Sequence, residues 1–542
     1  MASSSTMTTL SDVLYKQVAA RPDAIALIDA RRNFALSFAE LDKAACRVEQ
    51  ALTVAGLTSG DRVLLFQPMS AVLYVVLMAL FRQGMVAMFV DPSAEKGHLE
   101  RCCAIAPPQA FIASPKAQML RLVSLPLRQI PTAFVTVGTQ IRRLRIPSSP
   151  FNGKPTVPSP IRPSKNPQIA PAAIDADHPA LLTFTSGSTG KPKAALRTHA
   201  FLLAQHNALA HSLSLQAEAI DLTTLPIFVL ANLASGVTSL IPDADLRFPG
   251  KIKAGNVMRQ IHRYQPQSTA ASPAFLERLA EYCEETSQSL PSFQRIFSGG
   301  APVFPSLLER LQRLAPQATV TAVYGSTEAE PIAHIAYSDI TAGDRTAMSQ
   351  GNGLLAGKPV PEIQLRILQH PLKAPIPPLS QAEFDAKCSP PDTIGEIVVS
   401  GDHVLSGYLN GEGDAETKFR VAGVPWHRTG DAGYQDAQGR IWLLGRCAAR
   451  IDDERGRVYP FAVEAAAQSF PNVRRTALAN HGGKRILLVE WNGDAEDPDA
   501  LNEALSWAKL DQVRSHPIPL DRRHNAKVDY PALEQLLEDL EP

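Results

Sequence analysis

Apolar and polar residues alternate with two different periods along the first 140 residues of the chain. Segments with an apolar residue at every third or fourth position predict amphipathic helices, and short apolar runs predict buried strands. Amphipathic helices are expected at residues 12–21 and 37–56, and strands at 24–30, 61–68 and 85–90. The unbroken apolar run at 71–81 is expected to form a buried helix. Strands that alternate with helices are typical of an α/β fold with a mainly parallel sheet.

The same pattern continues after a proline-rich stretch. Eight prolines lie between Pro147 and Pro171, which excludes a regular element and predicts a long surface connection. Beyond it, residues 178–184 predict a strand, a glycine-rich loop follows, and residues 197–213 predict a helix. Short strands with glycine turns begin at Glu362 and predict a smaller β-rich unit. Residues 446–542 have a mixed α+β pattern and end in a helix.

The most apolar run, Ala71 to Phe81, is too short to cross a bilayer, which takes about 20 apolar residues. The N-terminus has no charged region followed by an apolar core, so a secretory signal is not expected. Six cysteines are scattered over 542 residues without a C-x-x-C pair. This usage is typical of reduced thiols in a cytoplasmic protein and does not predict a zinc site.

The composition is that of an ordinary globular chain, with 45% hydrophobic and 20% charged residues and a formal net charge of zero. A neutral chain has no general electrostatic preference for nucleic acid or for an acidic membrane surface, although a local basic site stays compatible with it.

The stretch TSGSTGKPKAA, residues 185–195, indicates a phosphate-binding loop. Glycines and hydroxyl residues let backbone N–H groups approach an anion, and Lys191 and Lys193 add positive charge. The loop is not a P-loop, because Thr185 and Pro192 stand where glycine and Ser/Thr are required, and it does not fit G-x-G-x-x-G. The alternative is a plain glycine-serine turn.

The loop resembles that of the adenylate-forming enzymes, which comprise acyl-CoA synthetases, peptide-synthetase adenylation domains and luciferases. Further motifs of that family follow in order over nearly the whole chain: SFAELD (37–42), VYGSTE (323–328), GEIVVSG (395–401), WHRTGD (426–431) and HNAKVD (524–529). The resemblance implies a large N-terminal α/β domain of several subdomains, residues 1–445. It also implies a small mobile α+β domain, residues 446–542, with a hinge near Ala448.

The resemblance implies attack of a carboxylate on the α-phosphate of ATP, which gives acyl-AMP and pyrophosphate. Two anions must meet, so cations and hydrogen-bond donors are needed around the phosphates. The residues implied for the β- and γ-phosphates are Thr185, Ser186, Gly187, Ser188, Thr189, Gly190 and Lys193. Lys191 is implied less directly than Lys193.

Other residues are implied for the nucleotide, the metal and the chemistry. Thr327 would donate to the α-phosphate, and Glu328 would hold Mg²⁺, which prefers oxygen ligands. Tyr324 would stack on adenine, Asp431 would bind the ribose hydroxyls, and Arg446 would reach ribose or phosphate. The segment Gly299, Gly300, Ala301 and Pro302 would line the other side of the adenine.

Lys527 would enter from the small domain and bridge the α-phosphate and the carboxylate. Four of the residues implied for the site also have an interpretation without a functional role. Tyr324 alone suits core packing, Asp431 suits a turn, Arg446 a weak surface ion pair, and Lys527 a solvated lysine.

The chain departs from thioester-forming members of the family at several positions. Phe228 is followed by Val229, where many members have an aromatic residue followed by histidine. The apolar stretch around them suits an acyl-chain pocket or an ordinary buried segment. Ala448, Asp452 and Arg455 replace an aspartate and the lysine and glycine that line the pantetheine tunnel. Val323 stands where Asn or Asp often precedes the tyrosine.

LFRQGMVAMFVDP, STEAEPIA, WHRTGDAGYQDAQGRIW and PLDRRHNAKV resemble the β-lactone synthetases of bacterial olefin biosynthesis. Those enzymes adenylate a long-chain 3-hydroxy acid, whose own hydroxyl then displaces AMP without CoA. The resemblance also implies association with other enzymes of an olefin or lipid pathway. The alternatives are an acyl-CoA or acyl-carrier ligase, and an inactive nucleotide-binding homologue.

Overall fold

The computed structural model describes residues 9–91, 97–144, 174–186, 191–369, 375–493, 496–520 and 528–540. The chain divides into two compact units. Unit 1 comprises residues 1–243 and 407–413, and unit 2 comprises residues 244–406 and 414–542. The expected domain boundary after residue 445 falls within unit 2 and stays a prediction. The proline-rich segment from Pro147 to Pro171 lies outside the described residues, as do Gly187 to Gly190 and Lys527.

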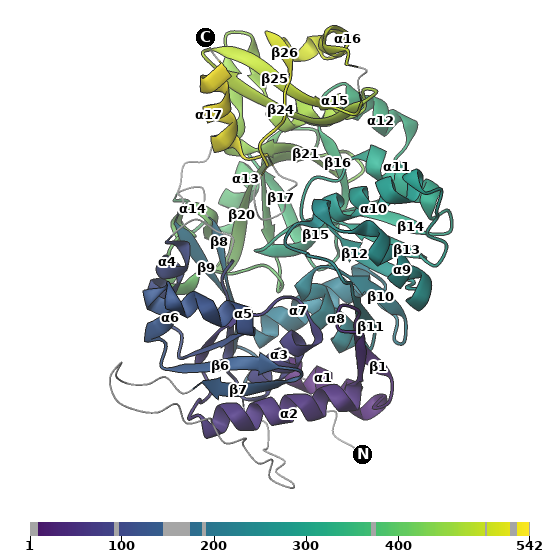
Figure 1. The fold of residues 1–542 in the computed structure, drawn as a ribbon. Coiled ribbons are helices and arrows are strands. Elements are labelled where there is room, and N and C mark those ends of the chain that lie inside the picture. The colour runs from purple at the N-terminus through teal and green to yellow at the C-terminus, as the bar shows by residue number, and fades with distance from the viewer. Residues whose placement is uncertain are drawn as a thin grey trace, which may run out of the picture. The chain divides into compact units, whose positions relative to one another are not determined.

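Unit 1 alternates helices and strands as the sequence predicts (Figure 1). Its helices are α1 (Leu10–Ala20), α2 (Phe38–Val54), α3 (Ala71–Arg82), α4 (His98–Ile105), α5 (Pro115–Gln118), α6 (Leu125–Gln129), α7 (His199–Ser212) and α8 (Pro226–Ser235). Its strands are β1 (Ile25–Asp29), β2 (Phe34–Ser37), β3 (Arg62–Phe66), β4 (Val86–Phe89), β5 (Ala110–Ala113), β6 (Thr132–Val137), β7 (Gln140–Leu144), β8 (Pro179–Ser186), β9 (Pro192–Thr198), β10 (Ile220–Thr223) and β11 (Thr238–Ile241).

Two sets of paired strands form the sheets of unit 1. One sheet has the order β7-β6-β5-β3-β4-β8-β9, with parallel pairing from β6 to β8 and antiparallel strands at both edges. In the other set, β10, β11 and β1 are parallel and β2 is antiparallel to β1. The α/β fold class expected from the sequence is confirmed.

Local signals explain several helix boundaries. Ser37 begins α2 with a capping box, because its Oγ accepts from Glu40 N at 3.2 Å and Glu40 Oε2 accepts from Ser37 N at 2.9 Å. Helix α8 ends at Gly236, which has φ of 74° and supplies the left-handed conformation that favours glycine. Helix α3 is buried over Ala71 to Phe81, which accounts for its apolar sequence without a membrane.

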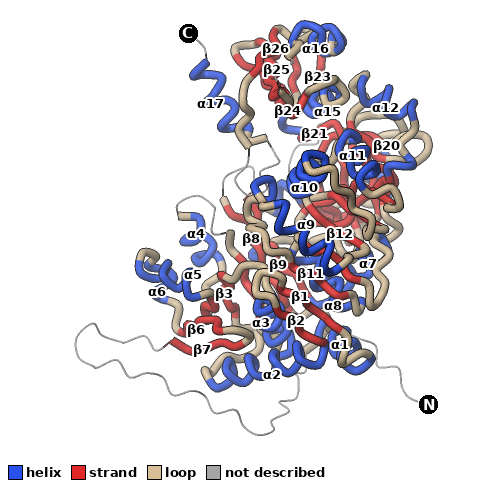
Figure 2. The backbone as a smooth tube through the Cα atoms, turned by 45° about the vertical axis from the view of Figure 1, so that its right-hand side comes forward, coloured by secondary structure: helices blue, strands red, loops and turns tan. Residues whose placement is uncertain are grey.

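One sequence prediction for this unit is wrong. The helix was expected directly after the glycine loop, but strand β9 comes first and pairs antiparallel with β8 (Figure 2). The loop therefore connects two strands of a hairpin. Lys193 and Ala195 belong to the β9 pairing register, opposite Thr185 and Thr183. Helix α7 follows at His199, capped by Thr198.

Unit 2 begins with parallel strands and continues into an antiparallel, β-rich part. Its first strands are β12 (Ser268–Ala271), β13 (Arg295–Ser298), β14 (Thr319–Ser326) and β15 (Ala329–Ala336), and its first helices are α9 (Ala254–Tyr264), α10 (Pro273–Glu285), α11 (Pro305–Leu314) and α12 (Ala342–Ser349). The β-rich part contains β16 (Leu354–Pro359), β17 (Gln364–Leu368), β18 (Gly395–Ser400), β19 (Lys418–Val421), β20 (Val424–Gln435) and β21 (Ile441–Arg446), with α13 (Gln381–Lys387) and α14 (Asp414–Thr417). These strands continue in the order β17-β18-β20-β21-β16-β15-β14-β13-β12.

The last hundred residues of unit 2 have their own small sheet and helices. Their elements are β22 (Ile451–Asp453), β23 (Gly456–Val458), α15 (Pro460–Ala467), β24 (Val473–His481), β25 (Lys484–Trp491), α16 (Pro498–Ala504), β26 (Gln512–Ser515) and α17 (Tyr530–Leu540). Strands β24, β25 and β26 form one sheet, and apolar residues of α15, β24 and β25 pack into a separate core. The mixed α+β pattern predicted for this part is confirmed.

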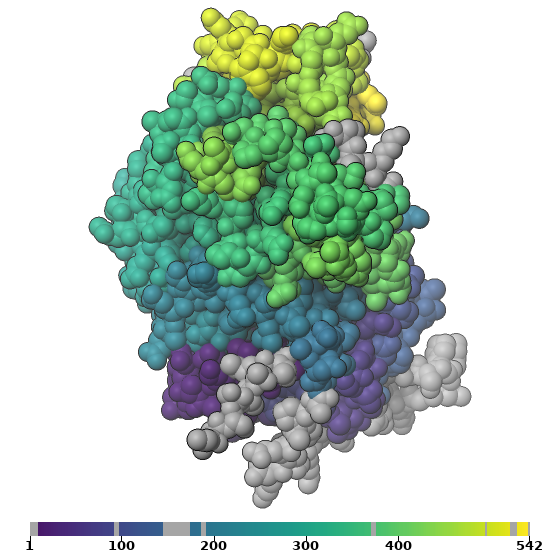
Figure 3. All heavy atoms as spheres, turned by 180° about the vertical axis from the view of Figure 1, so that it is seen from behind, coloured from purple at the N-terminus to yellow at the C-terminus, as the bar shows by residue number. Residues whose placement is uncertain are grey.

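Short 3-10 helices complete the description of both units: η1 (Met119–Leu122), η2 (Pro249–Lys251), η3 (Tyr337–Asp339), η4 (Leu409–Gly411), η5 (Cys447–Ala449) and η6 (Ser506–Ala508). Figure 3 shows one face of the molecule from behind as spheres, coloured from purple at the N-terminus to yellow at the C-terminus. Within the described residues, no helix is long and apolar enough to cross a membrane.

Candidate active site

The β8–β9 hairpin positions the two lysines of the predicted phosphate loop differently. Lys191 is exposed at the start of the hairpin's second arm. Lys193 is 8% exposed, and its Nζ lies 5.6 Å from the centroid of the Tyr408 ring. An aromatic face at this distance favours the charged ammonium group. The geometry therefore distinguishes Lys193 as the ordered lysine of the pair.

Gly413 packs against the stem of Lys193. A Cβ atom at Gly413 would lie 2.5 Å from Lys193 Cδ and 2.6 Å from its Cε, and the glycine has φ of 99°. The positive φ favours glycine at this position, and a Cβ atom there would displace the end of the Lys193 side chain. Tyr408 and Gly413 were not identified from the sequence, because they lie more than 200 residues after Lys193 and carry no phosphate-binding signature of their own.

In unit 2, the VYGSTE motif forms the turn of the β14–β15 hairpin. Tyr324 lies at the end of β14, and Thr327 and Glu328 occupy the connection to β15. The backbone N–H of Leu405 donates to the carbonyl oxygen of Glu328 at 2.7 Å. This bond holds the main chain of Glu328 and leaves its carboxylate to other partners.

Tyr324 and Asp431, which the sequence assigns to adenine and ribose, are in direct contact. The Tyr324 hydroxyl donates to Asp431 Oδ2 at 2.6 Å. Burial and the neighbouring carboxylate both raise the pKa of Tyr324 well above its ordinary value, so the phenol is the donor at neutral pH. The Asp431 N–H in turn donates to Thr429 Oγ1 at 3.0 Å.

Arg446 lies opposite Asp431 in the antiparallel register of β20 and β21. Its Nη1 is 3.3 Å from Asp431 Oδ1 and donates to the carbonyl oxygen of Thr429 at 2.8 Å. The Arg446 side chain is 60% exposed, so this ion pair contributes little to stability. Its exposure leaves the guanidinium accessible to a ligand.

The segment Gly299 to Pro302 follows strand β13, beside the end of β14. A Cβ atom at Gly299 would lie 3.0 Å from the carbonyl oxygen of Val323, and Gly300 has φ of 83°. Glycine at 299 therefore allows the backbone to approach the residue before Tyr324. Ala301 and Pro302 continue this segment, so the structure brings together the residues predicted for the two sides of the adenine.

His427 is a buried polar residue of the WHRTGD motif with no role assigned from the sequence. Its Nδ1 lies 3.1 Å from Lys418 Nζ and 3.2 Å from the carbonyl oxygen of Thr417. Burial and, secondarily, Lys418 lower the pKa of His427 to about 3, so the ring is neutral at physiological pH. Its position in the motif between Trp426 and Arg428 is the signal that could have identified it.

Around the C-terminal helix, a buried carboxylate joins three elements. Glu464 on α15 accepts at Oε1 from Leu478 N on β24 at 3.0 Å and from the Tyr530 hydroxyl on α17 at 3.1 Å. Burial raises the pKa of Glu464 to about 7. Lys527, three residues before Tyr530, lies outside the described residues, so its predicted role stays a prediction.

Arg455 is held in an ion-pair cluster at the turn between β22 and β23. Its Nη2 lies 2.9 Å from Asp453 Oδ2, and its Nη1 contacts Asp511. Asp452 pairs instead with Arg450 and Arg457. Thus Arg455, which stands in the place of a tunnel glycine under the family resemblance, has an ordered and bulky side chain.

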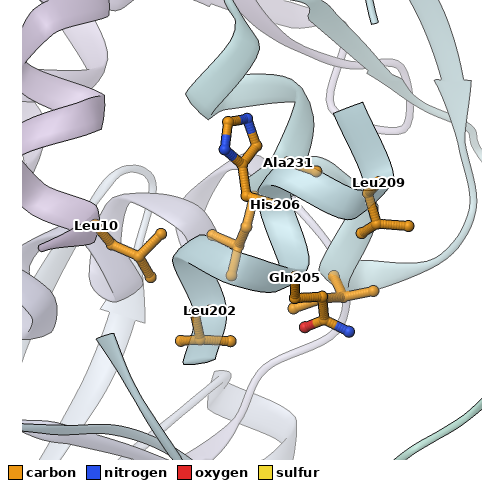
Figure 4. A pocket seen from close by; sticks show the side chains of 8 residues that line it. Leu10, Leu202, Gln205, His206, Leu209 and Ala231 are labelled. Carbon is orange, nitrogen blue, oxygen red and sulfur yellow. The ribbon is translucent and has the colours of Figure 1, made fainter. Parts of the chain in front are cut away.

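The apolar stretch around Phe228 forms helix α8 and is buried. A small hollow lies between α8, α7 and α1 in unit 1 (Figure 4). Its lining is mostly apolar and consists of Leu10, Leu202, Gln205, His206, Leu209, Ile227, Leu230 and Ala231. His206 Nε2 lies 2.9 Å from Ser235 Oγ. Phe228 and Val229 do not line this hollow, and the expected acyl pocket stays a prediction.

The chain is similar to known proteins over most of its length. The profile of the family described as "AMP-binding enzyme" matches residues 14–409. The olefin beta-lactone synthetase of Stenotrophomonas maltophilia is 33% identical over 91% of this chain and 89% of its own length. The enzyme of the same name from Xanthomonas campestris is 32% identical over 96% of each chain.

Solved structures show the same fold. ATP-bound MatB from Rhodopseudomonas palustris aligns with a TM-score of 0.75 at 20% identity, covering 98% of this chain and 100% of MatB. The amide bond synthetase McbA from Marinactinospora thermotolerans aligns with a TM-score of 0.75 at 20% identity, covering 97% and 99%. At this identity the similarity establishes the architecture only.

Proposed function

Since the chain belongs to the AMP-binding enzyme family and is therefore an adenylate-forming ligase, we propose that it converts a long-chain 3-hydroxy acid through acyl-AMP to a β-lactone. In the first step a carboxylate oxygen of the acid attacks the α-phosphorus of ATP, and pyrophosphate leaves. In the second step the 3-hydroxyl oxygen attacks the acyl carbonyl carbon, loses its proton, and AMP leaves. The second step is intramolecular, so proximity replaces an external nucleophile.

The similarity to two olefin beta-lactone synthetases carries this proposal, because it extends over more than nine-tenths of the chain at 33% and 32% identity. The ordered Arg455 supports it independently of overall identity. Under the family resemblance, a glycine at this position lines the pantetheine tunnel. A guanidinium held by Asp453 and Asp511 disfavours entry of that arm.

For the nucleotide, the site residues have complementary roles. Lys193 and the hydroxyl residues of the loop bind the β- and γ-phosphates. Asp431 binds the ribose hydroxyls: its oxygens face Tyr324 and Arg446, and each carboxylate oxygen has two lone pairs, so acceptor capacity remains. Tyr324 presents its ring to the adenine while its hydroxyl holds Asp431.

For the reacting groups, Thr327 donates to the α-phosphate, and Lys527 bridges the α-phosphate and the attacking carboxylate. Glu328 is the residue that holds Mg²⁺, which neutralises phosphate charge when bound. Among the described residues, no cluster of three or more metal-binding side chains occurs. Mg²⁺ is commonly held by one or two carboxylates together with substrate phosphates, and a single glutamate fits that mode.

Two further aspects of the proposal concern the cellular setting. A chain with six free cysteines suits the reducing cytoplasm. We also expect the enzyme to work beside others of an olefin or lipid pathway, since a reactive β-lactone requires a consuming reaction.

The test is mass spectrometry of products from purified protein, ATP, Mg²⁺ and a long-chain 3-hydroxy acid without CoA. The proposal expects AMP and a product lighter than the acid by one water. The matched control is the same acid without the 3-hydroxyl, which should stop at acyl-AMP. If acyl-AMP accumulates from the hydroxy acid and converts only when CoA is added, the protein is a thioester-forming ligase. ATP binding without pyrophosphate release would indicate an inactive homologue.

A further inference from the structure

A short segment of unit 1 turns a row of aliphatic side chains toward solvent. Five of the thirteen exposed large apolar residues in the described part of the chain fall between positions 119 and 125. Their side chains are exposed by 61% at Met119, 38% at Leu120, 67% at Leu122, 80% at Val123 and 59% at Leu125. Single exposed apolar residues are common, but a continuous group of this kind marks an interaction surface.

The backbone of this segment is firmly held, so its exposure is a property of the fold. Helix α5, η1 and α6 follow one another here (Figure 1). Gln118 Nε2 donates to the carbonyl oxygen of Phe134 on β6 at 2.6 Å, and Arg121 Nε donates to that of Leu127 at 3.1 Å. Leu127 and Ile130 are buried in the core of this sheet. These hydrogen bonds and buried side chains fix the orientation of the segment, and with it the residues that face solvent.

The same region is strongly basic in a chain that is neutral as a whole. Between Glu100 and Leu144 the sequence contains six lysines and arginines and no aspartate or glutamate. Lys116 and Arg128 are exposed within the segment itself. Arg142 and Arg143 are exposed on β7, the edge strand that pairs with β6. Exposed positive charge therefore flanks the aliphatic row in the chain, at Lys116 before it and at Arg128 after it.

We propose that a basic apolar face, formed by Lys116, Met119, Leu120, Leu122, Val123, Leu125 and Arg128, docks this protein on an anionic lipid bilayer. Aliphatic residues that enter the headgroup boundary, with lysine and arginine beside them, are the chemistry that binds anionic membranes peripherally. The centre of a protein interface is instead typically enriched in aromatic residues, and this face has none. The inference goes beyond the lactone chemistry and does not depend on it.

The docking has a consequence for substrate supply. A long acyl chain partitions into a bilayer, with about 0.8 kcal/mol for each buried methylene group. An enzyme docked on the bilayer can therefore bind such an acid directly from the membrane. Binding to vesicles requires no turnover, so it can be tested apart from the reaction.

The experiment is co-sedimentation of the full chain with vesicles of phosphatidylcholine alone and of phosphatidylcholine with phosphatidylglycerol. We expect binding to the anionic vesicles at low salt, weaker binding at high salt, and little binding to the neutral ones. The variant K116Q/R128Q should bind more weakly by about fivefold for each charge removed. The variant L122S/V123S/L125S should lose binding at either salt concentration.

Matched controls use exposed residues elsewhere on unit 1. Lys16→Gln removes an exposed charge from α1, and Val54→Ser removes an exposed apolar side chain at the end of α2. Both should bind vesicles as the wild type does, and all variants should retain pyrophosphate release with a short, water-soluble acid. Equal sedimentation with neutral and anionic vesicles would overturn the proposal. So would no sedimentation of the wild type, which would assign the face to a protein partner, or unchanged binding by both face variants.

Discussion

The hydroxyl of Tyr324 on β14 donates a hydrogen bond of 2.6 Å to the carboxylate of Asp431 on β20. The two residues are 107 positions apart in the sequence. The bond joins the residue proposed for adenine to the residue proposed for ribose, so the two contacts with the nucleoside are mechanically linked. Loss of one partner is expected to disturb the other.

Replacement of Tyr324 by phenylalanine tests this link. The ring remains to stack on adenine, but Asp431 loses the donor that orients it. We expect the KM for ATP to rise by about tenfold, as for loss of a hydrogen bond to a charged group, with a smaller change in kcat. Steady-state pyrophosphate release at varied ATP measures both constants. Tyr337→Phe is the control, and an unchanged KM in Tyr324→Phe would show that the bond does not support nucleotide binding.

The two lysines of the hairpin are expected to differ in their effect on ATP binding. Lys193→Ala removes a buried cation held over the Tyr408 ring, whereas Lys191→Ala removes an exposed one. We expect the KM for ATP to rise by at least about tenfold for Lys193→Ala. Lys191→Ala should change it by less than about threefold. Equal effects in the same assay would contradict the assignment based on burial.

Lys527→Ala is expected to lower the rate of adenylation by about 10²–10³-fold, the scale of a lost contact that stabilises developing charge. Binding of ATP should change much less, because the phosphates retain Lys193. Single-turnover formation of acyl-AMP measures the chemical step, and equilibrium binding of a nonhydrolysable nucleotide measures affinity. Lys484→Ala, an exposed lysine on β25, is the control. Normal adenylation by a folded Lys527→Ala variant would exclude the assignment.

Glu464 predicts a pH dependence of stability. Burial raises the pKa of its carboxyl from the ordinary value of 4.5 to about 7 in the folded protein. The folded state therefore binds the proton of Glu464 more tightly than the unfolded state does. The resulting stabilisation of the folded state is fully present below pH 4.5 and is lost as the pH rises to about 7. The loss over this window is about 3 kcal/mol at most, at about 1.4 kcal/mol for each pH unit.

Glu464→Gln should remove this dependence, since the amide oxygen can still accept from Leu478 N and from the Tyr530 hydroxyl. The free energy of unfolding of the variant minus that of the wild type is therefore expected to be larger at pH 8 than at pH 5. Urea unfolding followed by tryptophan fluorescence at both pH values measures the difference. Glu503→Gln, an exposed glutamate, should leave the profile unchanged. Parallel profiles for wild type and Glu464→Gln would be inconsistent with a raised pKa.

Arg455→Gly tests the acceptor of the second step. Removal of the guanidinium opens the position that, by the family resemblance, lines the pantetheine tunnel. We expect acyl-CoA to form only in this variant when ATP, acid and CoA are supplied, while pyrophosphate release changes by less than about threefold. Arg457→Gly, an exposed arginine paired with Asp452, is the control. Acyl-CoA formation by the wild type would contradict the role of Arg455.

Local sequence signals predicted much of the fold and part of the site. Helices α1 and α2 followed from apolar periodicity and α3 from its continuous apolar run, and the Ser37 capping box fixes the beginning of α2. Strand β9 was missed because its residues, PKAALRT, have no alternation, and only the pairing with β8 makes them a strand. Long-range partners were missed for the same reason: no local pattern joins Tyr324 to Asp431.

The segment 407–413 has a consequence for how the protein is made. This short piece belongs to unit 1, although the chain has already entered unit 2 at residue 244. A ribosome that has synthesised the whole β8–β9 hairpin has still not produced the aromatic ring that covers Lys193. Lys193 therefore acquires its native surroundings only after residue 413 has emerged from the ribosome. In a fragment ending at Asp243, the aliphatic part of the Lys193 side chain would be exposed to solvent.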